Sequence, residues 1–114
     1  MSGISTHILD TSLGRPATSI EVTLHRKTDD GTWQQLGLQQ TDNDGRCREM
    51  LPENISLDPG EYRLHFETAP YHCAQGVTAL YPFIEIPFMV REGDAHLHIP
   101  LLLTANGYTT YRGS

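Results

Sequence analysis

The stretch His96-Leu97-His98-Ile99-Pro100-Leu101-Leu102-Leu103 places an aliphatic side chain at every second position from Leu97 onward. Successive side chains of an extended strand point to opposite faces, so Leu97, Ile99, Leu101 and Leu103 share one face. The same alternation occurs in residues 20–24 and 62–66. Period two over several short runs is typical of β-strands rather than of helices.

Short turn-forming stretches separate these runs; they are rich in glycine, aspartate and proline and lie at residues 13–16, 29–31, 42–45, 58–60 and 92–94. Such residues terminate strands and reverse the chain direction. Several short strands with regularly spaced turns predict an all-β sandwich or barrel.

Two proline-containing segments interrupt this pattern. Residues 68–76 begin with threonine, carry Pro70 in the first turn and end at Gly76, which predicts one short helix. Pro82 and Pro87 flank residues 83–86. Proline cannot donate a ladder hydrogen bond, so we expect this segment to be an edge strand or to contain a bulge.

The length and the charge narrow the class of protein. A chain of 114 residues is too short for several domains, so we expect a single domain over residues 1–114. Its net charge is −6, with eight Lys and Arg against fourteen Asp and Glu, which argues against nucleic acid or an anionic membrane as a partner. No run approaches the ~18 apolar residues that cross a bilayer.

The N-terminal residues and the cysteines predict a cytoplasmic protein. Residues 1–7 contain neither the basic nor the apolar region of a secretory signal. Cys47 and Cys73 are not in a Cys-x-x-Cys spacing, and we expect two free thiols.

The six histidines are the unusual feature of the composition. His96 and His98 share one strand face, where they either meet solvent or line a site. Such a pair also chelates Zn²⁺ when a third ligand, here His7, joins it. The other three histidines, His25, His65 and His72, have no partner pattern and are interpreted as structural or surface residues.

Arg46 follows the tight turn Asp42-Asn43-Asp44-Gly45, which can aim the next side chain sharply. The alternative is a surface arginine paired with an aspartate of the turn. Cys47, between two arginines, is either a thiol of lowered pKa or a small strand residue. The turn does not match a calcium-binding loop, because its glycine comes too early and no glutamate closes it. The sequence also contains no nucleophile elbow, phosphate loop or dinucleotide fingerprint.

Three blocks of sequence together resemble a known family: residues 5–17, residues 41–47, and residues 96–103 running on to the terminal Tyr111-Arg112-Gly113-Ser114. The chain resembles, over essentially its whole length, the transthyretin-like family and within it the 5-hydroxyisourate hydrolases of urate degradation. Transthyretin proper, a thyroid-hormone carrier, shares the fold but lacks the terminal tetrapeptide and the residues matching His7, Arg46 and His98.

The resemblance implies a two-sheet β-sandwich with one short helix, assembled as a homotetramer from two dimers, with active sites in the channel between the dimers. It implies hydrolysis of a cyclic amide without cofactor or metal. His7 and His98 are the expected acid/base pair, Arg46 the electrostatic clamp, and Tyr111, Arg112, Gly113 and Ser114 the residues that position the substrate. His96 lies about 7 Å from His98 along the strand and is the doubtful member.

Two other functions remain open from the residues alone. One is a carrier of small aromatic ligands, and the other is a zinc-binding protein that uses His7, His96 and His98.

Overall fold

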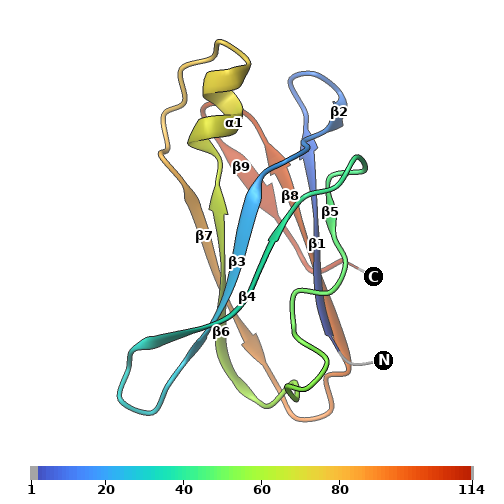
Figure 1. The fold of residues 1–114 in the computed structure, drawn as a ribbon, viewed down its shortest axis with the longest axis vertical. Coiled ribbons are helices and arrows are strands. Elements are labelled where there is room, and N and C mark those ends of the chain that lie inside the picture. The colour runs from blue at the N-terminus through green and yellow to red at the C-terminus, as the bar shows by residue number, and fades with distance from the viewer. Residues whose placement is uncertain (1–2, 114) are drawn as a thin grey trace.

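In the computed structural model, which describes residues 3–113, two β-sheets face each other and one short helix lies at an end of the molecule (Figure 1). The elements follow the chain as β1 (Gly3–Asp10), β2 (Arg15–Pro16), β3 (Glu21–Lys27), β4 (Trp33–Gln40), β5 (Arg46–Cys47), β6 (Gly60–Glu67), α1 (Ala69–Ala74), β7 (Ile84–Val90), β8 (His96–Leu103) and β9 (Tyr108–Thr110). The predicted two-sheet β-sandwich with one short helix is confirmed.

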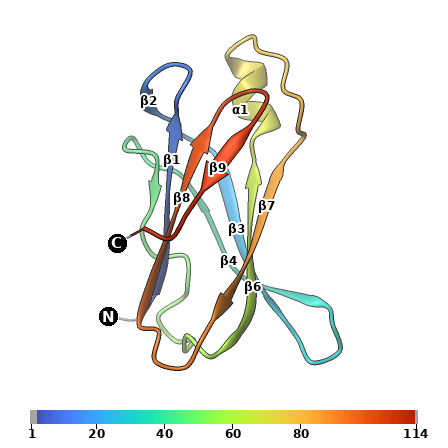
Figure 2. The same ribbon diagram turned by 180° about the vertical axis from the view of Figure 1, so that it is seen from behind.

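The first sheet joins the two ends of the sequence. Its strand order is β2-β1-β8-β9, with β5 also paired to β1, and Figure 2 shows β8 between β1 and β9. β1 and β8 run parallel, with Ser5 opposite His98 and His7 opposite Pro100. β5 is antiparallel to β1 and places Arg46 opposite His7. Residues that face each other across neighbouring strands project from the same face of the sheet.

The second sheet has the order β4-β3-β6-β7 and is antiparallel throughout. β7 contains Pro87 and is an edge strand, as the proline predicted. The pairing of β3 with β4 shifts register between Leu24 and His25, a β-bulge that the sequence analysis did not foresee.

The core lies between the two sheets and consists of the alternating residues of the strand predictions. Every second residue of β6 is fully buried, and so are the matching residues of β3; together they are Val22, Leu24, Tyr62, Leu64 and Phe66. From the other sheet, Ile4, Ile8, Leu101 and Leu103 are buried against them. Burial of each large aliphatic side chain stabilises the fold by about 1.5–3 kcal/mol. The opposite face of β1 and β8 is left free to carry polar groups.

α1 covers residues 69–74, so the helix is shorter than the expected segment 68–76. Pro70 lies in its first turn as predicted, but the Thr68 side chain makes no capping hydrogen bond. Instead, the Tyr71 hydroxyl donates to the Asp10 carboxylate at 2.7 Å and attaches the helix to the end of β1. Within residues 3–113, no helix is long and apolar enough to cross a membrane.

Candidate functional site

A hollow of about 300 Å³ lies on the face of the first sheet that points away from the core. Its walls come from β1, β5 and β8, which are distant in sequence and adjacent in the sheet. The residues that line it are Ser5, Thr6, Arg46, Arg48, His96 and His98. Two of the three predicted catalytic residues, Arg46 and His98, are therefore wall residues of one hollow.

The turn before β5 holds Arg46 in place. One carboxylate oxygen of Asp42 accepts hydrogen bonds from the backbone N–H groups of Asp44, at 2.9 Å, and of Arg46, at 3.0 Å. Gly45 has φ +75° and lies so close to β1 that a Cβ at this position would collide with the Ile8 carbonyl oxygen. Only glycine fits a position that combines this left-handed conformation with such close backbone contact. The turn therefore aims Arg46 from a fixed backbone, as the sequence predicted.

The carboxylates of the acidic turn pair with Arg48 and not with Arg46. Arg48 lies 3.4 Å from the Asp44 carboxylate and 3.8 Å from that of Asp42. Among residues 3–113, Arg46 makes no ion pair and no side-chain hydrogen bond. The alternative interpretation of Arg46, a surface arginine paired with a turn aspartate, thus describes Arg48.

His98 is half-buried and has a defined hydrogen-bond partner. The Ser5 hydroxyl lies 2.8 Å from Nδ1 of His98 and 3.0 Å from Nε2 of His96. Burial of the ring lowers the pKa of His98, and the positive charge of Arg46 and the nearby His7 and His96 lower it further. A histidine with a lowered pKa is neutral near pH 7 and can accept a proton.

His7 is half-buried and belongs to the same sheet face. It stands directly across from Arg46 on one side and from Pro100 on the other, two residues along β1 from Ser5. Its side chain is not part of the hollow's wall in the single chain. Strand pairing thus gathers His7, Arg46 and His98 at neighbouring positions on one face, although they are far apart in sequence.

The C-terminal segment folds over His98. The Gly113 N–H donates to the His98 carbonyl oxygen at 2.8 Å. A Cβ on Gly113 would lie 2.5 Å from Cδ2 of the His98 ring and 3.1 Å from Cγ of Pro100. A glycine is therefore required for the chain to pass over the imidazole.

The other three residues predicted to position the substrate are placed differently. Tyr111 is 55% exposed, and the Arg112 side chain is turned toward Asp94, at 3.4 Å. Neither side chain lines the hollow of the single chain. Ser114 lies outside the residues that the structure describes.

Two further predictions concern metal and thiol chemistry. Across residues 3–113, no three His, Cys, Asp or Glu side chains form a group that could hold a metal ion. Cys47 is buried, and this burial together with Asp42 raises the pKa of its thiol to about 11. Cys47 is thus the small strand residue of the two interpretations, and both cysteines are free as predicted.

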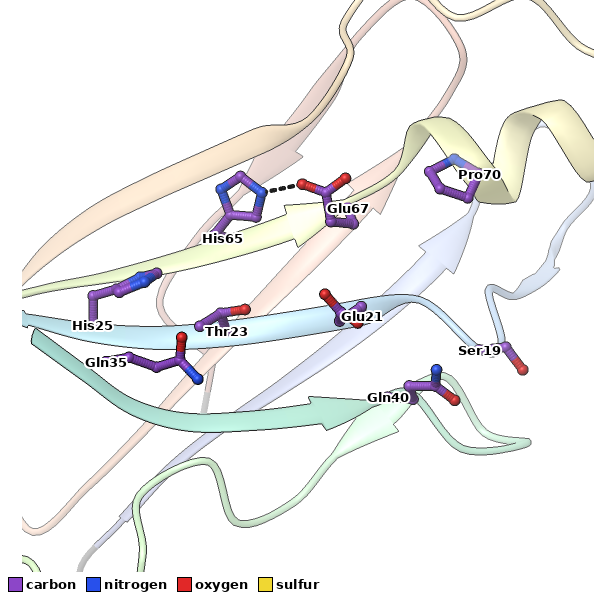
Figure 3. A pocket seen from close by; sticks show the side chains of 9 residues that line it. All are labelled: Ser19, Glu21, Thr23, His25, Gln35, Gln40, His65, Glu67 and Pro70. Atoms are coloured by element: carbon purple, nitrogen blue, oxygen red, sulfur yellow. Dashed lines mark hydrogen bonds and ion pairs between the residues drawn. The ribbon is translucent and has the colours of Figure 1, made fainter.

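A second hollow, of about 600 Å³, lies on the outer face of the other sheet (Figure 3). It is lined by polar side chains of β3, β4 and β6, among them His25 and His65. Nδ1 of His65 lies 2.8 Å from the carboxylate of Glu85, and Nε2 is hydrogen-bonded to Glu67. His65 therefore connects β6 with β7, which agrees with its interpretation as a structural residue.

Three residues of the first hollow, Ser5, Thr6 and Arg48, were not predicted from the sequence. The signal for Ser5 was its position two residues before His7, which places both side chains on the same strand face. The signal for Arg48 was its spacing of four and six residues from Asp44 and Asp42.

Comparison with known proteins gives consistent matches over the whole fold. Residues 4–113 match the HIUase/Transthyretin family. A 5-hydroxyisourate hydrolase of Salmonella dublin is 42% identical over 97% of this chain and 80% of the relative. The structure of Klebsiella pneumoniae 5-hydroxyisourate hydrolase superposes with a TM-score of 0.85 at 34% identity, covering 100% of both chains. Sea bream transthyretin in complex with thyroxine superposes with a TM-score of 0.90 at 33% identity, covering 96% of this chain and 93% of that one.

Proposed function

The chain belongs to the HIUase/Transthyretin family, and from that premise we propose that it hydrolyses 5-hydroxyisourate to 2-oxo-4-hydroxy-4-carboxy-5-ureidoimidazoline. The relatives named for this activity support the choice of substrate. The observation that carries the proposal is the convergence of His7, Arg46 and His98 on one sheet face, where Arg46 also lines the hollow beside His98.

The reaction begins with activation of water. One histidine, His98 in our assignment, accepts a proton as the water oxygen attacks a carbonyl carbon of the cyclic amide. Its lowered pKa supports this role, because the ring is unprotonated at neutral pH. The electron pair of the C=O bond moves to the oxygen, which becomes an oxyanion.

Arg46 stabilises that oxyanion. A guanidinium group is always charged and offers a planar set of donors, so it suits an oxygen that gains charge in the transition state. The tetrahedral intermediate then collapses, the C–N bond breaks, and the second histidine, His7, protonates the departing nitrogen. Water is consumed and the ring opens, and both histidines return to their starting states once the proton gained by His98 has been transferred to His7.

The terminal segment is assigned to substrate positioning. Gly113 passes over His98 and brings the C-terminal backbone to the site. We assign Tyr111, Arg112 and Ser114 to a wall of the site that forms when chains assemble.

The assembly that we propose is a homotetramer of two dimers, with the site faces of the sheets lining a channel between the dimers. Both sheets end in an unpaired edge, β7 in one and β9 in the other. Large apolar side chains are exposed along or beside these edges, namely Tyr81, Phe83, Met89 and Tyr108. Pairing of equivalent edges in a second chain would extend both sheets and cover this surface. We place the protein in the cytoplasm, where its two free cysteines stay reduced.

A second candidate function is the carriage of small aromatic ligands, which the superposition on a transthyretin–thyroxine complex favours. A carrier needs a largely apolar channel, whereas this face carries Arg46 and three histidines, His7, His96 and His98. Ultraviolet absorbance of freshly generated 5-hydroxyisourate separates the two functions. We expect decay much faster than the spontaneous rate in proportion to protein concentration, and an unchanged decay rate would overturn the hydrolase proposal.

The same assay, repeated with a metal chelator, tests whether a metal ion takes part in the reaction. The histidines and Arg46 supply the base and the charge stabilisation, so chelation is expected to leave the rate within about twofold. A more than tenfold loss that zinc restores would instead indicate a zinc-activated water.

A further inference from the structure

We propose that Ser5 connects His98 to His96 as a proton relay, in which His96 carries the proton abstracted at the site out to solvent. The kinetic test of this inference rests on the proposed function, whereas the NMR test of its hydrogen-bond geometry does not. Ser5 and His96 are positioning and relay residues here, while His98 remains the group that meets the reacting water.

The geometry places one hydroxyl between two imidazoles. Ser5 is 9% exposed, and its Oγ lies 2.8 Å from Nδ1 of His98 and 3.0 Å from Nε2 of His96. The two histidines reach it from alternate positions of β8, and Ser5 is paired directly with His98 in the parallel ladder. Both distances are those of ordinary hydrogen bonds.

The number of available protons restricts the directions of the two hydrogen bonds between these three side chains. A serine hydroxyl has one proton, so it donates to one ring nitrogen and accepts from the other. In the first arrangement, Nδ1–H of His98 donates to Ser5, and Ser5 donates to Nε2 of His96. Nε2 of His98 is then unprotonated and available as the base. In the second arrangement, both hydrogen bonds are reversed.

One turnover converts the first arrangement into the second. Nε2 of His98 gains the proton of the attacking water, while Nδ1 passes its proton to Oγ of Ser5, and Oγ passes its own proton to Nε2 of His96. His98 ends neutral with its proton on Nε2, and His96 becomes an imidazolium that releases a proton from Nδ1 to water. In the return step, Nδ1 of His96 takes a proton from water, both hydrogen bonds reverse, and Nε2 of His98 releases its proton to His7, which has given its own proton to the departing nitrogen. Every group regains its starting protonation state, and the solvent neither gains nor loses a proton.

The difference in exposure between the rings of His98 and His96 favours proton transfer from His98 toward solvent. His98 is half-buried next to Arg46 and His7, an environment that disfavours a lasting positive charge. His96 is exposed at the start of β8, where its ring meets solvent. The relay thus moves a charge from a position where it is costly to a position where water stabilises it.

Two variants distinguish a proton relay from the alternative that Ser5 only holds the His98 ring in position. Ser5→Ala removes the hydroxyl, and His96→Asn retains a hydrogen-bonding group next to Ser5 that cannot carry a proton. We expect both to lower kcat about tenfold or more, with KM within about twofold, because proton transfer is affected and substrate contacts are not. Ser12→Ala, in the exposed turn after β1, is the matched serine control and is expected to retain full kcat.

Added imidazole is the decisive kinetic probe. If the relay supplies a proton path, imidazole in the buffer restores kcat of Ser5→Ala and His96→Asn toward the wild-type value and leaves the wild type unchanged. A His96→Asn variant with wild-type kcat would overturn the relay, and so would a loss in both variants that imidazole does not relieve.

Nitrogen-15 NMR of the histidine rings tests the same geometry without substrate. We expect one His98 tautomer, with the proton on Nδ1, in the wild type and an increased fraction with the proton on Nε2 in Ser5→Ala. An unchanged His98 tautomer in Ser5→Ala would overturn the proposal even if the enzyme is active. If the wild type shows the expected tautomer and no hydrolysis, the proposed function fails while the hydrogen-bonded chain stands.

Discussion

Arg46 and Arg48 are two residues apart, but of the two only Arg48 forms ion pairs with the described residues. The turn carboxylates engage Arg48, so the guanidinium of Arg46 is left to the hollow that it shares with His98. The charged guanidinium of Arg46 beside the neutral ring of His98 is suited to stabilise the negative charge that develops in a transition state.

The first prediction concerns His7, Arg46 and His98 as one unit. His7→Asn and His98→Asn are each expected to lower kcat by on the order of 10²–10⁴, the range for loss of a general acid or base. Arg46→Lys is also expected to be poor, because a point charge does not reproduce the planar fork. The double histidine variant should lose much less than the product of the single losses, since both groups serve one reaction.

Steady-state kinetics on purified variants measures these effects, with His25→Asn from the other sheet as the control that should retain activity. Full activity in all three single variants would refute the site assignment. Retention by His98→Asn with loss in His96→Asn would mean that the base is His96.

The second prediction concerns Gly113. Gly113→Ala would place a methyl group 2.5 Å from the His98 ring, so either the ring or the terminal segment must move. We expect kcat to fall about tenfold or more while the melting temperature changes by less than about 3 °C, because the segment lies outside the core. Gly107→Ala is the matched control, since its Cβ would meet only Thr104 Oγ1 at 3.8 Å. Equal activity of the two variants would contradict a role for Gly113 in placing His98.

At the scale of elements, the His65 side chain connects β6 with β7 in addition to the backbone hydrogen bonds that pair the two strands. Burial alone would lower the pKa of His65, but its hydrogen bonds to Glu67 and Glu85 outweigh burial, and the net shift is upward. The folded state therefore holds the His65 proton more tightly than the unfolded chain, whose histidine has the ordinary value of 6.5. This stabilisation is complete below that value and disappears as the pH rises through the raised pKa of the folded state.

The third prediction follows from the upward shift of the His65 pKa. His65→Asn should lower the melting temperature more at about pH 6 than at about pH 9, where the wild-type ring is neutral. Thermal denaturation of both proteins across this range isolates the contribution of His65, because His98 and the other titrating groups are common to both. A difference between the two proteins that does not change with pH would show that the pair of carboxylates does not hold a proton on His65.

The strands of this fold were predictable to different degrees. The alternating apolar residues of β3, β6 and β8 are buried, so period two revealed these strands, although Thr23 and Pro100 between them are buried as well. β4 has no buried residue, and glutamines occupy four of its eight positions, so its pattern is weak. The helix was located from Pro70, whereas Thr68, which begins the predicted segment, is buried and makes no side-chain hydrogen bond to the helix.

The site was predictable only where its residues resemble a family motif. His7, Arg46 and His98 came from the resemblance, and period two placed His7 and His98 on strand faces. Ser5 was missed because its role depends on the parallel pairing of β1 with β8, which brings together residues 93 positions apart. No pattern within either strand specifies that partner.

At the scale of the whole molecule, the unpaired edges of β7 and β9 and their exposed apolar side chains lead to the fourth prediction. Light scattering at micromolar concentration should give a mass four times the 12.8 kDa of one chain. Met89→Lys on edge strand β7 places a charge on this surface and should shift the assembly toward smaller species, whereas a lysine at exposed Leu13, in a turn, should not. A wild-type monomer at this concentration would refute the tetramer.

The parallel pairing of β1 with β8 also determines when the protein can acquire its site. Among the described strands, β1 is synthesised well before β8, its longest partner. Until that partner is synthesised, the apolar side chains of Ile4 and Ile8 have no complete core to enter. Pairings between such distant segments carry a large loop-closure cost and slow folding. Ser5 and His98, which are 93 positions apart, therefore meet only after β8 has been synthesised, and a chain that stops before β8 contains His7 without His98.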